Sequence, residues 1–387
     1  MSIIILGSTG SVGKQAIEVA CAHNLKVSAL SCGSNVKLLE HQARMLGVRA
    51  CSVRDPEAAK ALRLSLADTS IKVYDGDDGL CEMIAELRAS KVLNAVSGFS
   101  GLRPTLAAID AGSDVALANK ESLVVAGKLV MARAKDAGVK ILPVDSEHSA
   151  LMQCMTHPQA VSRLILTASG GPFFGKTRAE TANVTPEQAL GHPTWKMGPR
   201  VTIDSSTLMN KGFEVIEAAR LYDISADKID VVIHRESIIH SMVEYIDSAL
   251  IAQLSQPDMR LCIQYALTYP ERLHGLTRRL DLADIGTLTF YRLDYKEFPL
   301  LGLAYEAEKR SDAARVALNA ADEVAVELFL DRKICYYDIA ELVCEVVRSA
   351  ADENYKDYAQ IAEADRAFRE KTLELARKLP QPQPICD

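Results

Sequence analysis

The first 145 residues alternate between short apolar runs and longer segments in which apolar residues recur with helical spacing. The segments 36–46 and 121–137 are two such predicted helices. Strands that alternate with helices are typical of a parallel, doubly wound sheet with crossover helices, which is an α/β fold. The predicted strands are 2–6, 26–32, 49–53, 71–74, 91–97, 114–118 and 139–144.

The pattern of predicted strands and helices changes after residue 145. Longer strands are predicted at 163–168, 229–234 and 238–255, and a Gly- and Pro-rich stretch occupies 170–200. From about residue 300 nearly every segment has helical spacing, as in 304–315 and 355–379. A chain of 387 residues is also too long for one ordinary core. We therefore expect a Rossmann-like domain at 1–145, a central α/β catalytic domain at 146–285, a linker at 286–298 and a helical C-terminal domain at 299–387, with a frayed tail at 380–387.

The composition argues against several classes of function. A net charge of −7 argues against a nucleic-acid-binding surface, which needs clustered basic residues. No apolar run is long enough to span a bilayer, so no membrane partner is expected. The nine cysteines include no C-x-x-C pair, which predicts reduced thiols. Because Met1 directly precedes the first predicted strand, no leader peptide is expected, and we predict a cytoplasmic protein.

A glycine-rich turn, G-S-T-G-S-V-G at 7–13, joins the first predicted strand to a helical segment. Glycines at this turn let backbone N–H groups approach a pyrophosphate, which predicts a dinucleotide site; a tight turn without ligand is the alternative. A mononucleotide P-loop does not fit, because Ser8 stands where its first Gly is needed and Gln15 where it needs Ser or Thr. The stretch 31–35, after the second strand, contains no acid, which favours NADP over NAD.

Two carboxylates, Asp145 and Glu147, come directly after the predicted strand at 139–144. One interpretation is a helix start, with Asp145 as the cap and Glu147 favoured by the helix dipole. The other is part of a divalent-metal site. Lys120 follows the preceding strand, at the edge where open α/β sheets bind ligands, although a solvated surface lysine is the simpler interpretation.

Further polar groups lie in the middle of the chain. Ser169 opens a glycine-rich turn whose N–H groups suit a phosphate. If a helix begins near 208, Asn210 and Glu214 share one face of it, although an ordinary capped amphipathic helix also explains this pattern.

Seven stretches together resemble the 1-deoxy-D-xylulose 5-phosphate reductoisomerase family, and they occur in family order over most of the chain. The resemblance implies rearrangement of 1-deoxy-D-xylulose 5-phosphate and its reduction by NADPH to 2-C-methyl-D-erythritol 4-phosphate, a step of isoprenoid precursor synthesis. It also implies a Mg²⁺ or Mn²⁺ ion and a homodimer. The stretches are GSTGSVG, LANKESLV, PVDSEHSA, ASGGPF, HPTWKMG, DSSTLMNKGFE and HRESIIHSMVEY.

The resemblance also implies roles for individual residues. The implied metal ligands are Asp145, Glu147 and Glu214, whereas spacing alone does not choose Glu214 over Glu217. Catalytic roles are implied for Lys120, Glu147 and His192. The resemblance implies that the substrate phosphate is held by Ser169, Ser205, Asn210 and Lys211. It implies contacts to the rest of the substrate from Ser146, Lys120 and His192, and it places Glu214 in the same substrate site. The implied NADPH contacts are Thr9, Gly10, Ser11, Val12, Gly33, Asn35, Asn119, Glu121 and Gly198. The stretch 192–198, with Trp195 and Met197, resembles a mobile flap.

One position departs from the family pattern, because Ser34 stands where many members carry a basic residue. Two other functions fit parts of the sequence. A semialdehyde- or homoserine-type NADP dehydrogenase opens with a similar glycine turn but needs no set of separated carboxylates. A redox-sensing NADP(H)-binding regulator needs neither Lys120 nor the phosphate-binding groups.

Overall fold

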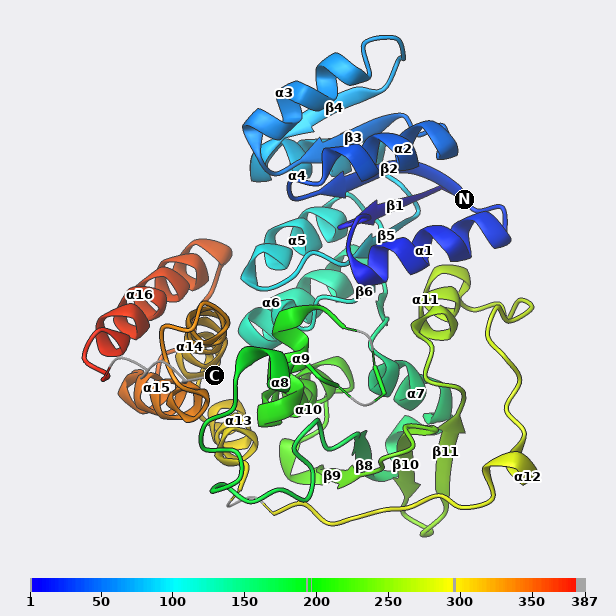
Figure 1. Cartoon of the computed structure of the whole chain (residues 1–387). Coiled ribbons are helices and arrows are strands. Elements are labelled where there is room, and N and C mark those ends of the chain that lie inside the picture. The colour runs from blue at the N-terminus through cyan, green and yellow to red at the C-terminus, as the bar shows by residue number, and fades with distance from the viewer. Residues whose placement is uncertain (1, 193, 196, 295–296, 381–387) are drawn as a thin grey trace. The chain divides into compact units, whose positions relative to one another are not determined.

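The computed structural model describes residues 2–192, 194–195, 197–294 and 297–380 (Figure 1). The predicted flap, linker and tail therefore each lie partly outside the described residues. The chain forms two compact units. Unit 1 contains the residues up to Ser122, with Lys128–Met152 and Asp258–Arg279. Unit 2 contains Leu123–Gly127, Gln153–Pro257 and the chain from Leu280 onward.

Unit 1 is built on a parallel sheet, seven-stranded within the described residues, with the order β4-β3-β2-β1-β5-β6-β7. All seven strands predicted from the apolar runs are confirmed, although their ends shift by up to three residues. The strands are β1 (Ser2–Leu6), β2 (Lys26–Cys32), β3 (Ala50–Val53), β4 (Lys72–Asp75), β5 (Lys91–Asn94), β6 (Asp114–Leu117) and β7 (Ile141–Pro143).

Helices cover this sheet, and the apolar side chains of β1 from Ile3 to Leu6 are fully buried, as in parallel sheets that are covered on both faces. The predicted helices at 36–46 and 121–137 are confirmed. The helices are α1 (Ser11–Ala22), α2 (Val36–Leu46), α3 (Pro56–Ser65), α4 (Gly76–Leu87), α5 (Leu102–Asp110), α6 (Glu121–Ala137) and α11 (Met259–Thr268), and the chain leaves the unit along α7 (Ser146–Cys154).

The strand order reverses at β1, which pairs with β2 on one side and with β5 on the other. Open α/β sheets bind ligands beyond the carboxyl ends of the strands at such a point. The turn at 7–13 follows β1, and the loop at 95–101 follows β5. Both therefore lie at the ligand-binding edge.

Segment Asp258–Arg279 packs in unit 1 although it comes late in the chain. Buried Lys91, on β5, explains part of this packing, because its ammonium donates to the carbonyl oxygens of Ala266, Leu267 and Tyr269 at 2.9–3.1 Å. Those carbonyls belong to the C-terminal end of α11, where a helix leaves acceptors without intrahelical donors. The domain limits predicted from the sequence divide the chain differently, and they stay a prediction.

Unit 2 contains a mixed sheet, four-stranded within the described part of the chain, with the order β11-β10-β8-β9. Strands β8 (Val161–Ala168) and β9 (Ile229–Ile233) are parallel, and β10 (Ile239–Tyr245) runs antiparallel to β8 and to β11 (Leu250–Leu254). The single strand predicted at 238–255 is therefore wrong. It is a hairpin, whose turn contains Ser248 at a φ of +68°.

Most of the remaining regular structure of unit 2 is helical, and the helical C-terminal region is confirmed. The helix predicted at 304–315 is wrong in its limits, because Ser311 separates two helices. Its backbone is extended, and its hydroxyl caps the second helix by accepting from the N–H of Ala314 at 3.2 Å. The helices are α8 (Pro186–Ala189), α9 (Pro199–Thr207), α10 (Met209–Leu221), α12 (Leu282–Ile285), α13 (Pro299–Arg310), α14 (Asp312–Leu330), α15 (Tyr336–Ser349) and α16 (Tyr358–Ala376).

Candidate active site

The glycine turn after β1 is tightly packed. A Cβ atom on Gly7, whose φ is +74°, would lie 2.5 Å from the carbonyl oxygen of Ala95, and one on Gly13 would lie 2.2 Å from that of Gly7. Gly10 is the N-cap of α1, and no described side chain caps this helix. The turn therefore suits an anion at the start of α1. Thr9, Gly10, Ser11 and Val12 all lie on it.

Buried Gln42 on α2 holds this turn in place. Its side chain accepts from the Ser8 hydroxyl at 2.8 Å and donates to the Ser8 carbonyl oxygen at 3.1 Å. Our sequence analysis missed Gln42, whose signal was a polar residue within the apolar spacing of 36–46. Nearby, Asn35 caps α2 by accepting from the Leu38 N–H at 3.3 Å, and a Cβ on Gly33 would meet no atom within 4 Å.

Asn119 and Glu121, both buried, shape the loop after β5. Glu121 accepts from the N–H of Gly98 at 2.9 Å and from the Asn119 amide at 2.8 Å. The same amide donates to the Gly98 carbonyl oxygen at 2.9 Å. The two predicted cofactor contacts therefore fix the backbone of a loop that borders the reversal point of the sheet.

Lys120 and Asp145 are brought together by neighbouring parallel strands. Lys120 follows β6, Asp145 follows β7, and the two strands pair along their length. The Lys120 ammonium lies 2.5 Å from Asp145 Oδ2, and both side chains are largely buried. Lys120 is therefore part of a buried ion pair and is not a solvated surface lysine.

The acidic segment after β7 begins α7. Asp145 Oδ1 accepts from the Ser146 N–H at 3.0 Å, and Glu147 lies in the first turn of the helix. Glu147 Oε2 also accepts from the Ser146 hydroxyl at 2.5 Å. The helix-start interpretation is therefore correct as far as the local backbone goes. Asp145 and Glu147 are also carboxylates, the kind of ligand that Mg²⁺ and Mn²⁺ prefer.

In unit 2, Ser169 and His192 form a hydrogen-bonded pair with 3.0 Å between Ser169 Oγ and His192 Nε2. His192 Nδ1 accepts from the backbone N–H groups of Thr194 and Trp195, at 3.2 and 2.9 Å. The neutral ring must therefore carry its proton on Nε2 and donate it to Ser169. Burial, and secondarily the charge of Arg235, lowers the pKa of His192.

Trp195 and Met197, the predicted flap residues, are both half-buried. The Trp195 ring lies 6.1 Å from the ring of His240, measured between centroids. Gly198 lies in unit 2 as the N-cap of α9. The other predicted cofactor contacts belong to unit 1.

Apart from Ser169, the predicted phosphate and metal residues of unit 2 lie on α9 and α10. Ser205 is half-buried near the end of α9. On α10, buried Glu214 accepts from the Asn210 amide at 2.5 Å and forms an ion pair with Lys211. Glu217 is also buried, so burial does not distinguish it from Glu214.

Three family models match the chain, at residues 3–127, 141–222 and 254–371. The first describes 1-deoxy-D-xylulose 5-phosphate reductoisomerase, and each of the other two describes a C-terminal domain of that enzyme. The chain belongs to the 1-deoxy-D-xylulose 5-phosphate reductoisomerase family. A reductoisomerase from Caldanaerobacter subterraneus is 48% identical over 96% of this chain and 98% of its own length. One from Heliobacterium modesticaldum is 49% identical over 94% of each.

Solved reductoisomerase structures share the fold. The Zymomonas mobilis enzyme in complex with NADPH has a TM-score of 0.91 and 38% identity, covering 98% of this chain and 99% of that one. A reductoisomerase in complex with NADPH, fosmidomycin and magnesium has a TM-score of 0.95 and 37% identity, covering 99% and 100%. The predicted enzyme class, fold and reaction are thereby confirmed for this reductoisomerase, and NADPH and a divalent metal are confirmed as the family's cofactors.

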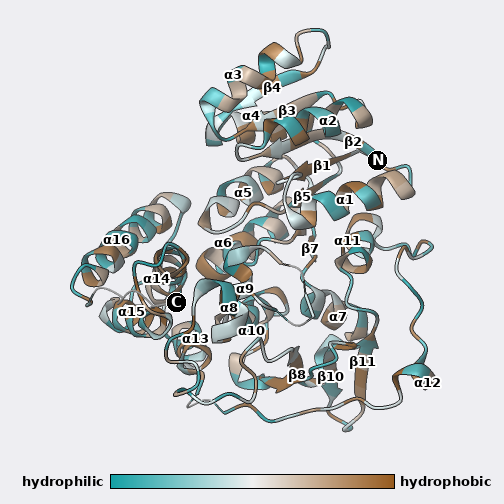
Figure 2. Cartoon of the chain, viewed as in Figure 1, coloured by the Kyte–Doolittle hydropathy of each residue, from teal (hydrophilic) through white to brown (hydrophobic). Residues whose placement is uncertain are grey.

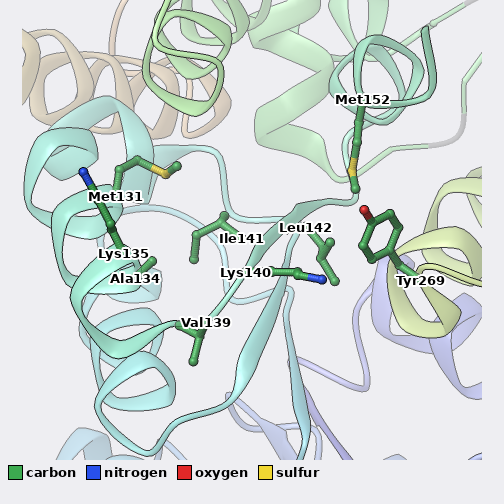
Figure 3. Close-up of a pocket in the computed structure, with 9 residues that line it drawn as sticks. All are labelled: Met131, Ala134, Lys135, Val139, Lys140, Ile141, Leu142, Met152 and Tyr269. Carbon is green, nitrogen blue, oxygen red and sulfur yellow. The ribbon is translucent and has the colours of Figure 1, made fainter. Parts of the chain in front are cut away.

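The predicted reductoisomerase residues do not line the pocket shown in Figure 3. This pocket has a volume of about 300 Å³ and lies in unit 1, beside β7. Its lining combines α6, β7, Met152 of α7 and Tyr269, which follows α11.

No described helix is long and apolar enough to cross a membrane.

Proposed function

We propose that the residues named from the family resemblance form the active site in which this chain converts 1-deoxy-D-xylulose 5-phosphate to 2-C-methyl-D-erythritol 4-phosphate. The observation that carries the proposal is the buried pair of Lys120 and Asp145 at the carboxyl ends of β6 and β7. Such ends are where open α/β sheets place their chemistry. In this proposal Lys120 supplies positive charge beside a developing oxyanion.

Asp145, Glu147 and Glu214 are the proposed ligands of a Mg²⁺ or Mn²⁺ ion. The donor set fits, because all three side chains are carboxylates, the hard oxygen ligands that Mg²⁺ and Mn²⁺ prefer. When bound, the metal polarises substrate oxygens and lowers the pKa of a hydroxyl. Ser146 keeps the Glu147 carboxylate oriented through its hydroxyl.

The NADPH site is proposed at the turn after β1, with contacts from the nine residues named above. Two observations support it: the turn packs too tightly for any side chain at Gly7 or Gly13, and no described side chain caps α1. NADPH supplies the hydride. Asn119 and Glu121 hold the loop after β5 in the shape that faces the cofactor.

The substrate phosphate is proposed to bind Ser169, Ser205, Asn210 and Lys211. His192, neutral and donating from Nε2, orients the Ser169 hydroxyl. The flap residues Trp195 and Met197 then close over the substrate, because binding energy from the remote phosphate can drive closure and orientation. Trp195 is the only tryptophan in the chain, so its fluorescence reports this closure directly.

The choice between Glu214 and Glu217 tests the metal site. Glu214→Gln removes an anionic ligand at constant volume, so metal affinity and turnover should both fall, turnover by at least about a hundredfold. NADPH affinity should persist. Glu217→Gln is the matched control, because Glu217 is another buried carboxylate on the same helix. This substitution should lower turnover by only a small factor.

Metal-dependent oxidation of NADPH with 1-deoxy-D-xylulose 5-phosphate gives the turnover, and thermal unfolding checks that both variants remain folded. Equal and modest losses in the two variants would mean that the third ligand is another residue.

A cytoplasmic homodimer is the proposed state of the protein. The support for a dimer is the edge strand β11, which is labelled in Figure 2. On this strand Leu250 and Ile251 are 51% and 41% exposed, and Ile246, in the hairpin turn before it, is 77% exposed. An exposed apolar edge strand is a site of pairing with another chain, and natural proteins otherwise protect such edges with charge. A second copy of the chain would cover it.

A further inference from the structure

The motif H-R-E-S-I-I-H at 234–240 contains Arg235, to which neither the sequence nor the family resemblance assigned a role. Arg235 follows β9, and Ser169 follows its parallel neighbour β8. The ends of the two strands are joined by the hydrogen bond from the His234 N–H to the Ala168 carbonyl oxygen at 2.7 Å. The fold therefore brings Arg235 beside the turn that carries Ser169.

One nitrogen of the Arg235 guanidinium clamps this turn. Nη1 donates to the carbonyl oxygens of Ser169 and Gly171, at 3.1 Å each. Ser169 and Gly171 flank Gly170 in the chain. Gly170 and Gly171 have positive φ values of +80° and +66°. Backbone of this kind has little intrinsic preference for one shape, so a charged donor shared by two of its carbonyls fixes the turn.

The other side of the guanidinium is fixed by an aromatic ring. The Arg235 guanidinium carbon lies 4.8 Å from the centroid of Phe174, which in turn lies 5.2 Å from Tyr291. Tyr291 exchanges two backbone hydrogen bonds with Ile233, at the end of β9. The arginine is therefore stacked on a side chain that is itself anchored to the sheet, which suits a planar guanidinium and not an ammonium.

The clamped turn also meets the rest of the proposed phosphate site. A Cβ on Gly171 would lie 2.8 Å from the Ser205 carbonyl oxygen, so the turn packs directly on α9. The Ser169 hydroxyl accepts from the Gly171 N–H at 3.3 Å and pairs with His192. A shift of the turn would therefore displace Ser169 from both His192 and α9.

We propose that Arg235 is a positioning residue for substrate binding: it holds the 169–171 turn so that the Ser169 hydroxyl, paired with His192, meets the substrate phosphate. The proposal rests on the phosphate role proposed above for Ser169. Arg235 acts through the turn and makes no contact with the reacting carbons. The charge of Arg235 also helps to keep His192 neutral, which preserves the donor on Nε2.

The test compares Arg235→Gln, Arg235→Lys, Ser169→Ala and the double variant Arg235→Gln/Ser169→Ala. Loss of a charge-assisted hydrogen bond predicts that Arg235→Gln raises KM for 1-deoxy-D-xylulose 5-phosphate about tenfold, with a smaller effect on kcat. The constant for competitive inhibition by inorganic phosphate should rise by a similar factor, and NADPH affinity should not change. Arg235→Lys keeps the charge but not the planar fork, so its KM should resemble that of Arg235→Gln.

Because Arg235 acts through Ser169, the double variant should be little worse than Ser169→Ala alone. Arg178→Gln is the matched control, since Arg178 also lies over an aromatic ring in unit 2, that of Tyr337 at 4.5 Å, and its ion pair is with Glu341 of α15. Its KM should equal that of the wild type. The thermal midpoint checks that each variant is folded.

Three results would overturn the inference: an unchanged KM in Arg235→Gln, full rescue by Arg235→Lys, or effects of Arg235 and Ser169 that multiply independently. An unchanged KM in Ser169→Ala would instead contradict the phosphate role of Ser169 in the proposed function. The two failures are thus separable.

Discussion

At the scale of single residues, hydrogen-bond direction determines the chemistry of His192. Two backbone N–H groups donate to Nδ1. A proton on Nδ1 would point at both of these donors, so protonation of this nitrogen is disfavoured. Burial acts in the same direction, and Arg235 adds to it. The side chain is thereby held neutral as a donor from Nε2, a state suited to orienting a serine hydroxyl.

We predict that His192 titrates below its ordinary value of 6.5 and that its neutral form is the Nε2–H tautomer. The unfolded chain then binds the proton first as the pH falls below 6.5. The contribution of His192 to stability therefore declines between 6.5 and its folded pKa and is fully present above 6.5. Nitrogen-15 NMR of the imidazole measures both the tautomer and the midpoint.

Substitution of Arg235 by Gln should raise that midpoint, because a nearby positive charge is removed, whereas Arg178→Gln should leave it in place. A wild-type midpoint above 6.5, or a dominant Nδ1–H tautomer, would contradict this account of His192.

At the scale of elements, one lysine ties a late helix to an early strand. Lys91 is buried on β5, and its three bonds go to carbonyl oxygens at the end of α11. Burial lowers the pKa of its ammonium, and the three acceptors satisfy its three donors. An apolar side chain of similar length would leave these carbonyls without their donor in a buried setting.

Lys91→Met should therefore loosen the C-terminal end of α11, at a cost of about 2–4 kcal/mol for the lost charge-assisted bonds. Hydrogen exchange at residues 266–271 should accelerate. Lys140→Met is the matched control, because exposed Lys140 contacts the same segment through a cation–π contact, 5.1 Å from the Tyr269 ring in the pocket of Figure 3. Equal exchange rates in the two variants would show that Lys91 does not secure α11.

In unit 1, the strands of the sheet could be predicted from the sequence, whereas the attachment of α11 to the sheet could not. The strands of the parallel sheet are buried on both faces and read as continuous apolar runs, so all seven could be predicted from the sequence. The attachment of α11 depends on Lys91 and on carbonyls about 175 residues further along, which no local pattern encodes. The break at Ser311 and the hairpin turn at Ser248 lie in short polar stretches, 309–312 and 247–248, which a solvated helix face or an exposed strand position can also carry, so both were missed.

In the candidate site, likewise, several residues could be named from the sequence, but the contacts that orient them could not. Family motifs named Ser169, His192 and Lys120, but the bonds that orient them could not be predicted. Gln42 and Arg235 make contacts across elements, to the 7–13 turn and the 169–171 turn, and neither contact has a signature in the sequence.

At the scale of the whole molecule, the charge and the exposed apolar surface favour association with a second copy. The chain carries a net charge of −7, which keeps non-specific association weak, yet β11 leaves Leu250 and Ile251 exposed on a sheet edge. Paired edges satisfy their backbone groups and bury such side chains together. We therefore expect a symmetric dimer, the commonest form of homo-oligomer.

Sedimentation of the wild-type chain should give the mass of a dimer, and Ile251→Lys should shift it towards the monomer, because a charge at an edge strand opposes pairing. Leu64→Lys is the matched control. Leu64 is a more exposed apolar residue, at 80%, but it lies on α3 and not on a sheet edge, so this variant should remain dimeric. A dimer that survives Ile251→Lys, or one that Leu64→Lys disrupts equally, would place the interface away from β11. If the monomeric variant also keeps its affinity for NADPH, the cofactor site, with all but one of its proposed residues in unit 1, forms without the partner copy.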